Sequence, residues 1–268
     1  MRNNFTVKIN NTTFHYNDIG KSEVPLVFIH GFPFDRTSWH AQQDALSKEY
    51  RVITYDIRGF GSTPNDSDTR LSMEVFADDL IRFLEALKIE KAVVCGLSMG
   101  GYILMNAYKN APEKFAALIL CDTQCNADSA EAKEKRYNTI EQIQGGGITD
   151  FAEGFVKNIF HESSFTARQE KVEETKQVIL QTAQQTLIGA LKALANREET
   201  CSMLGDISVP TLIICGKQDK VTPIEKSEEL HKGIKGSVYK TIDKAGHVSN
   251  MEQPEAFNKL ISDFLKDL

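Results

Sequence analysis

Short runs of apolar residues alternate along the chain with longer segments whose apolar residues recur every three or four positions. The short runs predict buried strands, and the longer spacing predicts helices with one apolar face. The expected strands are 25–30, 51–55, 93–95, 117–121, 211–215 and 238–242, preceded by a hairpin of 5–9 and 13–16 that turns at Asn10 and Asn11. The expected helices are 38–47, 71–87, 99–109, 224–232 and 254–268.

Strands that alternate with helices predict an α/β fold, in which a mostly parallel sheet is flanked by helices on both faces. The alternation stops after Asp122, and residues 123–205 are helical throughout, with a break expected at Gly145–Gly147. We expect residues 1–122 and 206–268 to form the core domain and residues 123–205 to form an inserted helical cap. Ligands in such sheets bind beyond the carboxyl ends of the strands, so this insertion is expected to cover the site.

The composition is that of a globular protein, with 41% hydrophobic and 25% charged residues. A formal net charge of −6 argues against nucleic acid or an anionic membrane as a partner. Residues 1–16 alternate apolar and polar positions without a run of signal-peptide length, and no apolar stretch approaches the ~18 residues of a membrane span. We expect a cytoplasmic protein.

The five cysteines are an odd number and do not suggest a disulfide framework. Cys95, Cys121 and Cys215 each end an apolar run, which predicts buried thiols. Cys121 and Cys125 have no second pair to complete a zinc site. His161 and Glu162 begin a H-E-x-x-H pattern, but Phe165 stands in place of the second histidine, so we expect no metal site.

The stretch VVCGLSMGGY, residues 93–102, changes from a strand pattern to a helix pattern at Ser98. The pattern G-x-S-x-G alone is weak evidence, but between a strand and a helix it indicates a sharp turn that projects the serine oxygen from the top of the sheet. Side chains two residues before and after would collide at such a turn, which suits Gly96 and Gly100. Ser98 is the candidate nucleophile.

A serine hydroxyl needs a base to accept its proton, and the base needs a carboxylate to orient it. His247 follows the last strand and is the candidate base, whereas His30 is expected to brace its own loop. Asp219, which follows strand 211–215, is the candidate acid and completes the chain order serine, acid, histidine. Asp122 also ends a strand and remains the alternative acid.

The oxyanion of the reaction needs backbone donors. One is expected from Met99, the residue after Ser98, and the other from the loop after His30. Pro33 has no N–H group, so Phe32 is the best-placed donor in that loop. Phe32, Phe34 and Trp39 are the candidates to line an apolar substrate pocket, although Trp39 also fits simple helix packing.

The segments HGFPFDRTSW, YDIRGFGSTP, CGLSMGGY, GKQDKVTP and AGHVSNMEQPEAF together resemble the α/β-hydrolase superfamily over nearly the whole chain. Within it, the chain is most similar to the carboxylesterase and 3-oxoadipate enol-lactonase-like branch. The resemblance implies an eight-stranded sheet, a helical cap and acyl chemistry without a cofactor. It assigns Ser98, Asp219 and His247 to the triad, and Phe32 and Met99 to the oxyanion hole.

These features predict a serine hydrolase that cleaves small carboxylic esters or lactones through an acyl-enzyme on Ser98. The proline of HGFP is also similar to cofactor-free haloperoxidases and perhydrolases. The same triad serves C–C hydrolases and ligand receptors with little turnover, so these alternatives stay open. The expected partner is a small-molecule ester or lactone, and the expected assembly is a monomer or a homodimer.

Overall fold

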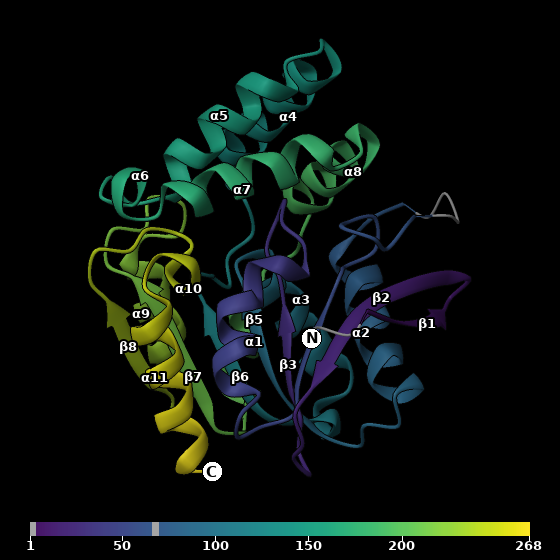
Figure 1. The fold of residues 1–268 in the computed structure, drawn as a ribbon, viewed down its shortest axis with the longest axis vertical. Helices are drawn as coiled ribbons and strands as arrows, with labels where there is room; N and C mark the ends of the chain where they lie inside the picture. The colour runs from purple at the N-terminus through teal and green to yellow at the C-terminus, as the bar shows by residue number, and fades with distance from the viewer. Residues whose placement is uncertain (1–3, 66–69) are drawn as a thin grey trace.

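The computed structural model describes residues 4–65 and 70–268, so residues 1–3 and 66–69 of the expected core domain lie outside it. One eight-stranded sheet runs through the molecule in the order β1-β2-β4-β3-β5-β6-β7-β8 (Figure 1). Its strands are β1 (Phe5–Ile9), β2 (Thr12–Ile19), β3 (Leu26–Ile29), β4 (Val52–Tyr55), β5 (Ala92–Leu97), β6 (Phe115–Cys121), β7 (Thr211–Gly216) and β8 (Val238–Ile242).

Pairing in the sheet follows the predicted pattern. β1 and β2 form the antiparallel hairpin, β2 pairs antiparallel with β4, and all the other neighbouring strands are parallel. The central strands β3, β4, β5 and β7 are buried along their whole length, which is why they are continuous apolar runs. The predicted α/β class is confirmed.

Helices cover both faces of this sheet. α1 packs beside α11 on the face nearer the viewer in Figure 1, and α2 packs beside α3 on the other. The core helices and turns are η1 (Arg36–Trp39), α1 (His40–Leu46), α2 (Met73–Ala86), α3 (Met99–Asn110), η2 (Pro112–Lys114), α9 (Ile224–Gly233), α10 (Ser249–Glu252) and α11 (Pro254–Lys266). The helix expected at 38–47 begins two residues earlier as a 3-10 turn, and the Asp35 side chain caps it by accepting the N–H of Thr37.

A layer of helices between β6 and β7 lies over the carboxyl ends of the parallel strands (Figure 1). It contains α4 (Ala130–Gln144), α5 (Ile148–Ile159), α6 (Ser164–Ala167), α7 (Gln169–Gln181), α8 (Gln184–Ala195) and the 3-10 helix η3 (Cys201–Asp206). α4 packs on α8 and α5 on α7, and the expected glycine break separates α4 from α5. We call this layer, residues 123–205, the helical insertion.

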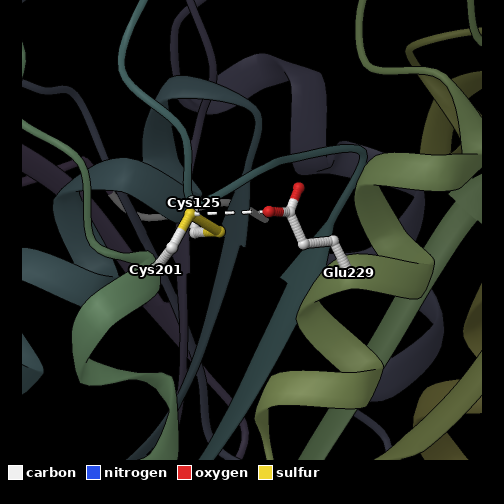
Figure 2. Close-up of side chains that lie close together, drawn as sticks. All are labelled: Cys125, Cys201 and Glu229. Carbon is white, nitrogen blue, oxygen red and sulfur yellow. Dashed lines mark hydrogen bonds between the residues drawn. A yellow bond between two sulfur atoms is a disulfide. The ribbon is translucent and has the colours of Figure 1, made fainter.

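A disulfide joins Cys125 to Cys201 (Figure 2), so the expectation drawn from the odd number of cysteines is wrong. The two residues are 76 positions apart, but one follows β6 and the other precedes β7. Because β6 and β7 are neighbours in the sheet, the start and the end of the helical insertion meet. The bridge therefore closes the neck of the insertion.

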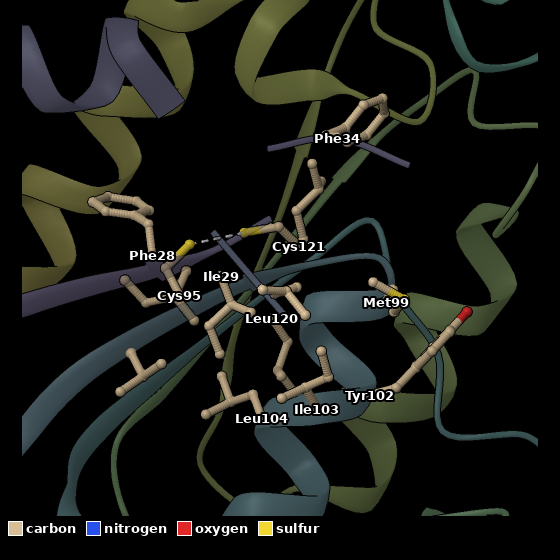
Figure 3. Close-up of a cluster of buried hydrophobic side chains, with 14 of the residues drawn as sticks. Phe28, Ile29, Phe34, Cys95, Met99, Tyr102, Ile103, Leu104, Leu120 and Cys121 are labelled. Carbon is tan, nitrogen blue, oxygen red and sulfur yellow. Dashed lines mark hydrogen bonds between the residues drawn. The ribbon is translucent and has the colours of Figure 1, made fainter. Parts of the chain in front are cut away.

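The other three cysteines, Cys95, Cys121 and Cys215, are free buried thiols, as predicted. Figure 3 shows Cys95 and Cys121 within the apolar cluster around β3, β5 and α3, where their sulfur atoms lie 3.6 Å apart. The same cluster contains Phe28, Met99 and Ile103. None of the described helices combines the length and the apolarity that crossing a membrane requires.

Candidate active site

Ser98 stands between the end of β5 and the first residue of α3, with φ 53° and ψ −114°. A positive φ is unusual for a residue with a side chain, and it marks a strained turn held by the surrounding structure. The N–H of Ser98 donates to the Cys121 carbonyl at 2.9 Å, which fixes the turn to β6. Ser98 is 9% exposed beneath the helical insertion.

Glycines make room for this turn. A Cβ atom on Gly96 would lie 2.4 Å from the carbonyl oxygen of Gly100, and one on Gly100 would lie 2.4 Å from that of Ile29. Backbone atoms cannot move aside at these distances, so neither position tolerates a side chain without shifting the strand or the helix. The two glycines of the G-x-S-x-G pattern therefore allow the close backbone approach that the sharp turn at Ser98 requires, as expected.

His247 reaches Ser98 from the loop between β8 and α10. Its Nε2 atom lies 2.7 Å from Ser98 Oγ, and its Nδ1 atom lies 2.8 Å from Asp219 Oδ2. The imidazole is 2% exposed, so water competes little for either hydrogen bond. The three side chains form one chain of hydrogen bonds, along which the imidazole can accept the hydroxyl proton while the carboxylate balances its charge.

Asp219 follows β7, and its own loop holds the carboxylate in place. Oδ1 accepts the N–H groups of Val221 at 2.7 Å and Thr222 at 3.0 Å, and Oδ2 accepts the Thr222 hydroxyl at 2.7 Å. Burial raises the pKa of Asp219. The charge of His247 and the hydrogen bonds from His247 and Thr222 together lower it by more, so the net pKa is below its usual range. Asp219 is therefore a carboxylate near neutral pH.

The imidazole of His247 is more basic than an ordinary histidine. Burial lowers its pKa. The charge and the hydrogen bond of Asp219 raise the pKa, and so do the charges of Asp122 and Glu252. The net pKa is above the ordinary value of 6.5. The raised pKa means that the imidazole holds an accepted proton more strongly than an ordinary histidine does, which favours its role as a general base.

Asp122, the alternative acid, follows the end of β6 and binds Gly216 and Ser249 rather than the imidazole. Its Oδ1 accepts the N–H of Gly216 at 2.7 Å, and its Oδ2 accepts the hydroxyl of Ser249 at 2.6 Å. Burial, with a further contribution from the charge of Asp219, raises the pKa of Asp122 to about 7. Asp219, not Asp122, is hydrogen-bonded to His247.

His30 braces its own loop. Its Nδ1 atom lies 2.9 Å from the Gly31 carbonyl, and its Nε2 atom accepts the N–H of Ile57 at 3.0 Å. Burial lowers the pKa of His30 to about 4, so it is a neutral ring that joins the loops after β3 and β4.

Phe32 and Met99, the candidate oxyanion donors, belong to the loop after β3 and to the start of α3. Met99 is the first residue of α3, so its N–H belongs to the helix start, where the amide groups have no intrahelical acceptor. Phe32 lies in the loop after β3, and a Cβ atom on the preceding Gly31 would lie 3.2 Å from Ser98 Cβ. The two candidate donors thus belong to segments that flank the serine.

Aromatic rings of α5 cover the Phe32 loop, a feature that the sequence analysis missed. The ring centroid of Phe32 lies 6.3 Å from that of Phe151 and 6.0 Å from that of Phe155, and Phe34 lies 6.3 Å from Phe155. The i, i+4 spacing of the two α5 residues is the signal that could have identified them. We call Phe32, Phe34, Phe151 and Phe155 the aromatic cluster. Trp39 instead packs against Phe28 and Phe257 in the core.

One group of possible metal ligands exists within the described part of the chain, at Cys125, Cys201 and Glu229, whose ligand atoms lie within 4.8 Å of one another (Figure 2). The two sulfur atoms are bonded to each other, and a disulfide sulfur is not the thiolate that metals bind. The group therefore does not fit a metal ion in this state.

Comparison with known proteins identifies the family of this fold and site. The model of the alpha/beta hydrolase fold family matches residues 24–254. The match covers most of the chain, including the turn at Ser98 and the loops of Asp219 and His247. The chain belongs to the α/β-hydrolase family, as the sequence motifs predicted, and is a hydrolase.

Individual relatives lie within the same family. The chain is 31% identical over 245 residues to 3-oxoadipate enol-lactonase 1 of Acinetobacter baylyi, covering 91% of this chain and 89% of the relative. A thermophilic esterase from Thermogutta terrifontis superposes with a TM-score of 0.91 at 34% identity, covering 100% of this chain and 98% of the esterase. The enol-lactonase from Burkholderia xenovorans gives a TM-score of 0.90 at 26% identity, covering 97% and 99% of the two chains.

Proposed function

We propose that this protein is a serine hydrolase that cleaves small carboxylic esters or lactones through an acyl-enzyme formed on Ser98. The observation that carries the proposal is the hydrogen-bond chain from Ser98 Oγ to His247 Nε2 at 2.7 Å and from His247 Nδ1 to Asp219 at 2.8 Å. The similarity to an esterase and to enol-lactonases supports the same class of bond.

In the proposed reaction, His247 accepts the proton of Ser98 as its oxygen attacks the ester carbonyl. Asp219 holds the imidazole in position and stabilises its cation. His247 then returns the proton to the alkoxide leaving group, which leaves an acyl-enzyme on Ser98. A water molecule, deprotonated by His247, attacks this second ester and releases the acid, so the cycle needs no cofactor.

The tetrahedral intermediates carry a negative oxygen, and the N–H groups of Phe32 and Met99 are proposed to hold it. Each donor of this kind contributes roughly 2.7–4 kcal/mol to stabilisation of the transition state. The positive end of the α3 dipole at Met99 adds to the same effect.

The aromatic cluster supports an apolar acyl group of modest size as the substrate. Phe32 and Phe34 come from the loop proposed to hold the oxyanion, and Phe151 and Phe155 cover them from α5. Ser98 is 9% and His247 2% exposed, so we propose that α5 and its neighbours move away from that loop to admit the substrate.

The test is hydrolysis of p-nitrophenyl esters from acetate to octanoate by the wild-type protein and by Ser98→Ala. We expect turnover with a preferred chain length, and a loss in the variant of several orders of magnitude, since removing a triad nucleophile costs ~10⁶ in a well-studied protease. Equal and negligible rates in both proteins would contradict ester hydrolysis and favour a C–C hydrolase, a perhydrolase or a ligand receptor.

A further inference from the structure

Glu252, a buried carboxylate, joins the loop of His247 to the helical insertion. Its side chain is 1% exposed, and Oε1 accepts the N–H of Gly246 at 2.6 Å. Oε2 accepts the N–H of His161 at 2.7 Å and the hydroxyl of Ser164. Gly246 is the residue before His247, whereas His161 and Ser164 belong to the helical insertion, so a single carboxylate binds both parts of the molecule.

A second contact joins the same two segments without using Glu252. The N–H of His247 itself donates to the carbonyl of Ile159, the last residue of α5, at 2.7 Å. A Cβ atom on Gly246 would lie 2.4 Å from that carbonyl oxygen and 3.1 Å from the His161 nitrogen. The backbone of the insertion thus lies directly on the backbone of the His247 loop, with no room for a side chain at position 246.

The donors that meet at Glu252 would be left without an acceptor if the carboxylate were removed. Water could not take its place, because the site is buried. The titratable or charged side chains that face it are His161 and Arg168 from the insertion, and His247 from the loop it binds. Arg168 donates to the Glu252 carbonyl at 3.2 Å, and its other nitrogen pairs with the exposed Glu255 at 3.3 Å. Burial raises the pKa of Glu252 while its three hydrogen bonds lower it, and the net pKa is above its usual range.

We propose that Glu252 is a positioning residue that aligns His247 with Ser98 only while residues 159–164 of the helical insertion are seated against the His247 loop. The proposal rests on the proposed function, because it assigns the catalytic base to His247. Movement of the insertion then has two consequences: it opens the site to substrate, and it loosens the loop that positions the base. Closure over a bound ester restores both.

Glu252→Gln tests the proposal because it keeps the size of the side chain, removes the charge, and replaces one acceptor oxygen with an N–H₂ donor. We expect kcat for p-nitrophenyl esters to fall about 10- to 100-fold, as displacing a catalytic group by about 1 Å does, with a change in KM below about threefold. The acid limb of the pH profile should move to lower pH, because the charge of Glu252 is one of those that raise the pKa of His247.

Two further variants separate positioning from general stability. Ser164→Ala removes only the hydroxyl from the insertion, so it should lower kcat less than Glu252→Gln does and leave the acid limb unmoved. Glu255→Gln is the matched control: it lies three residues further along the chain, its side chain is 82% exposed, and it should change neither kcat nor the pH profile.

NMR titration of the His247 imidazole and hydrogen exchange of the His247 amide require no turnover, so they decide the proposal even where the esterase assay fails or kcat is too low to measure. Glu252→Gln should lower the imidazole pKa and speed exchange of the amide that donates to Ile159. The proposal is overturned if Glu252→Gln keeps the wild-type kcat, pH profile and exchange rate. It is equally overturned if Ser164→Ala and Glu255→Gln change kcat to the same extent.

Discussion

Asp122 holds Ser249 through two hydrogen bonds to one oxygen, which accepts the backbone N–H at 3.2 Å and the side-chain hydroxyl at 2.6 Å. Its other oxygen accepts the N–H of Gly216, the last residue of β7. Ser249 lies two residues after His247, and Gly216 lies three residues before Asp219. One buried carboxylate therefore fixes the loops that carry Asp219 and His247, whereas the sequence made it the alternative acid only because it ends a strand.

Replacing each of the two carboxylates should have different effects. Asp219→Asn is expected to lower kcat/KM for p-nitrophenyl esters by about 10⁴-fold, because the amide no longer fixes the tautomer or balances the imidazolium charge. Asp122→Asn should cost about tenfold or less in kcat/KM, because the hydrogen bond from His247 to Asp219 remains. Steady-state kinetics of the two variants test this difference. A larger loss of kcat/KM in Asp122→Asn than in Asp219→Asn would identify Asp122 as the acid of the triad.

The pKa of His247 sets the acid limb of the pH profile. The imidazole must be neutral to accept the Ser98 proton, so activity is present above its pKa and lost as the pH falls through it. Because that pKa lies above 6.5, kcat/KM should reach half its maximum at a pH above 6.5.

Asp122→Asn supplies the electrostatic control for this limb. The charge of Asp122 contributes to the raised pKa of His247, but the pKa of Asp122 is itself raised to about 7, so Asp122 is only partly ionised across the acid limb and its removal should move the midpoint to lower pH by a small amount. A wild-type midpoint below 6.5, or one that does not move in the variant, would contradict the charge distribution described for the site.

The aromatic cluster should set the preferred acyl length. Phe155→Ala removes the ring that contacts both Phe32 and Phe34, so we expect a preference for longer p-nitrophenyl esters and a higher KM for the short ones. Phe165→Ala changes a ring in α6 that is 38% exposed, and it should leave the chain-length profile unaltered. Identical profiles in Phe155→Ala and the wild type would remove α5 from the substrate pocket.

The disulfide between Cys125 and Cys201 should stabilise the fold. A bridge across 76 residues restricts the unfolded chain, and in the loop-entropy model this contributes ~4.5 kcal/mol to the free energy of unfolding. Cys125→Ser with Cys201→Ser should lower the denaturation midpoint to that of the wild type kept in a reducing agent. The bridge also predicts that three thiols are alkylated in the unfolded, unreduced wild type and five after reduction. Alkylation of all five cysteines before reduction would contradict the bridge.

The order of the core strands and long helices could be predicted from the sequence because their apolar residues recur with the period of a strand or a helix. Residues 93–95 are apolar since β5 is buried on both faces, and Gly96 and Gly100 are glycines since backbone atoms occupy the space of their side chains. His247 and Asp219 could be identified by their places after strands, because parallel strands end at one edge of the sheet.

Contacts between segments distant in the sequence could not be predicted in the same way. The pairing of Cys125 with Cys201 depends on β6 and β7 being neighbours, which the number of cysteines does not reveal. α10 is too short for its periodicity to be recognised, so Glu252 gave no signal of its link to Ser164. Phe151 and Phe155 form an ordinary amphipathic pattern, and only the packing of α5 shows which rings they contact.

Covalent labelling tests the central claim, that Ser98 is the nucleophile, most directly. The protein is treated with an activated alkyl phosphonate, weighed intact, digested, and the modified peptide is sequenced by mass spectrometry. We expect one adduct per chain, on Ser98 within residues 93–102, and none in Ser98→Ala. An adduct on another residue, or turnover of esters without any adduct on Ser98, would contradict it.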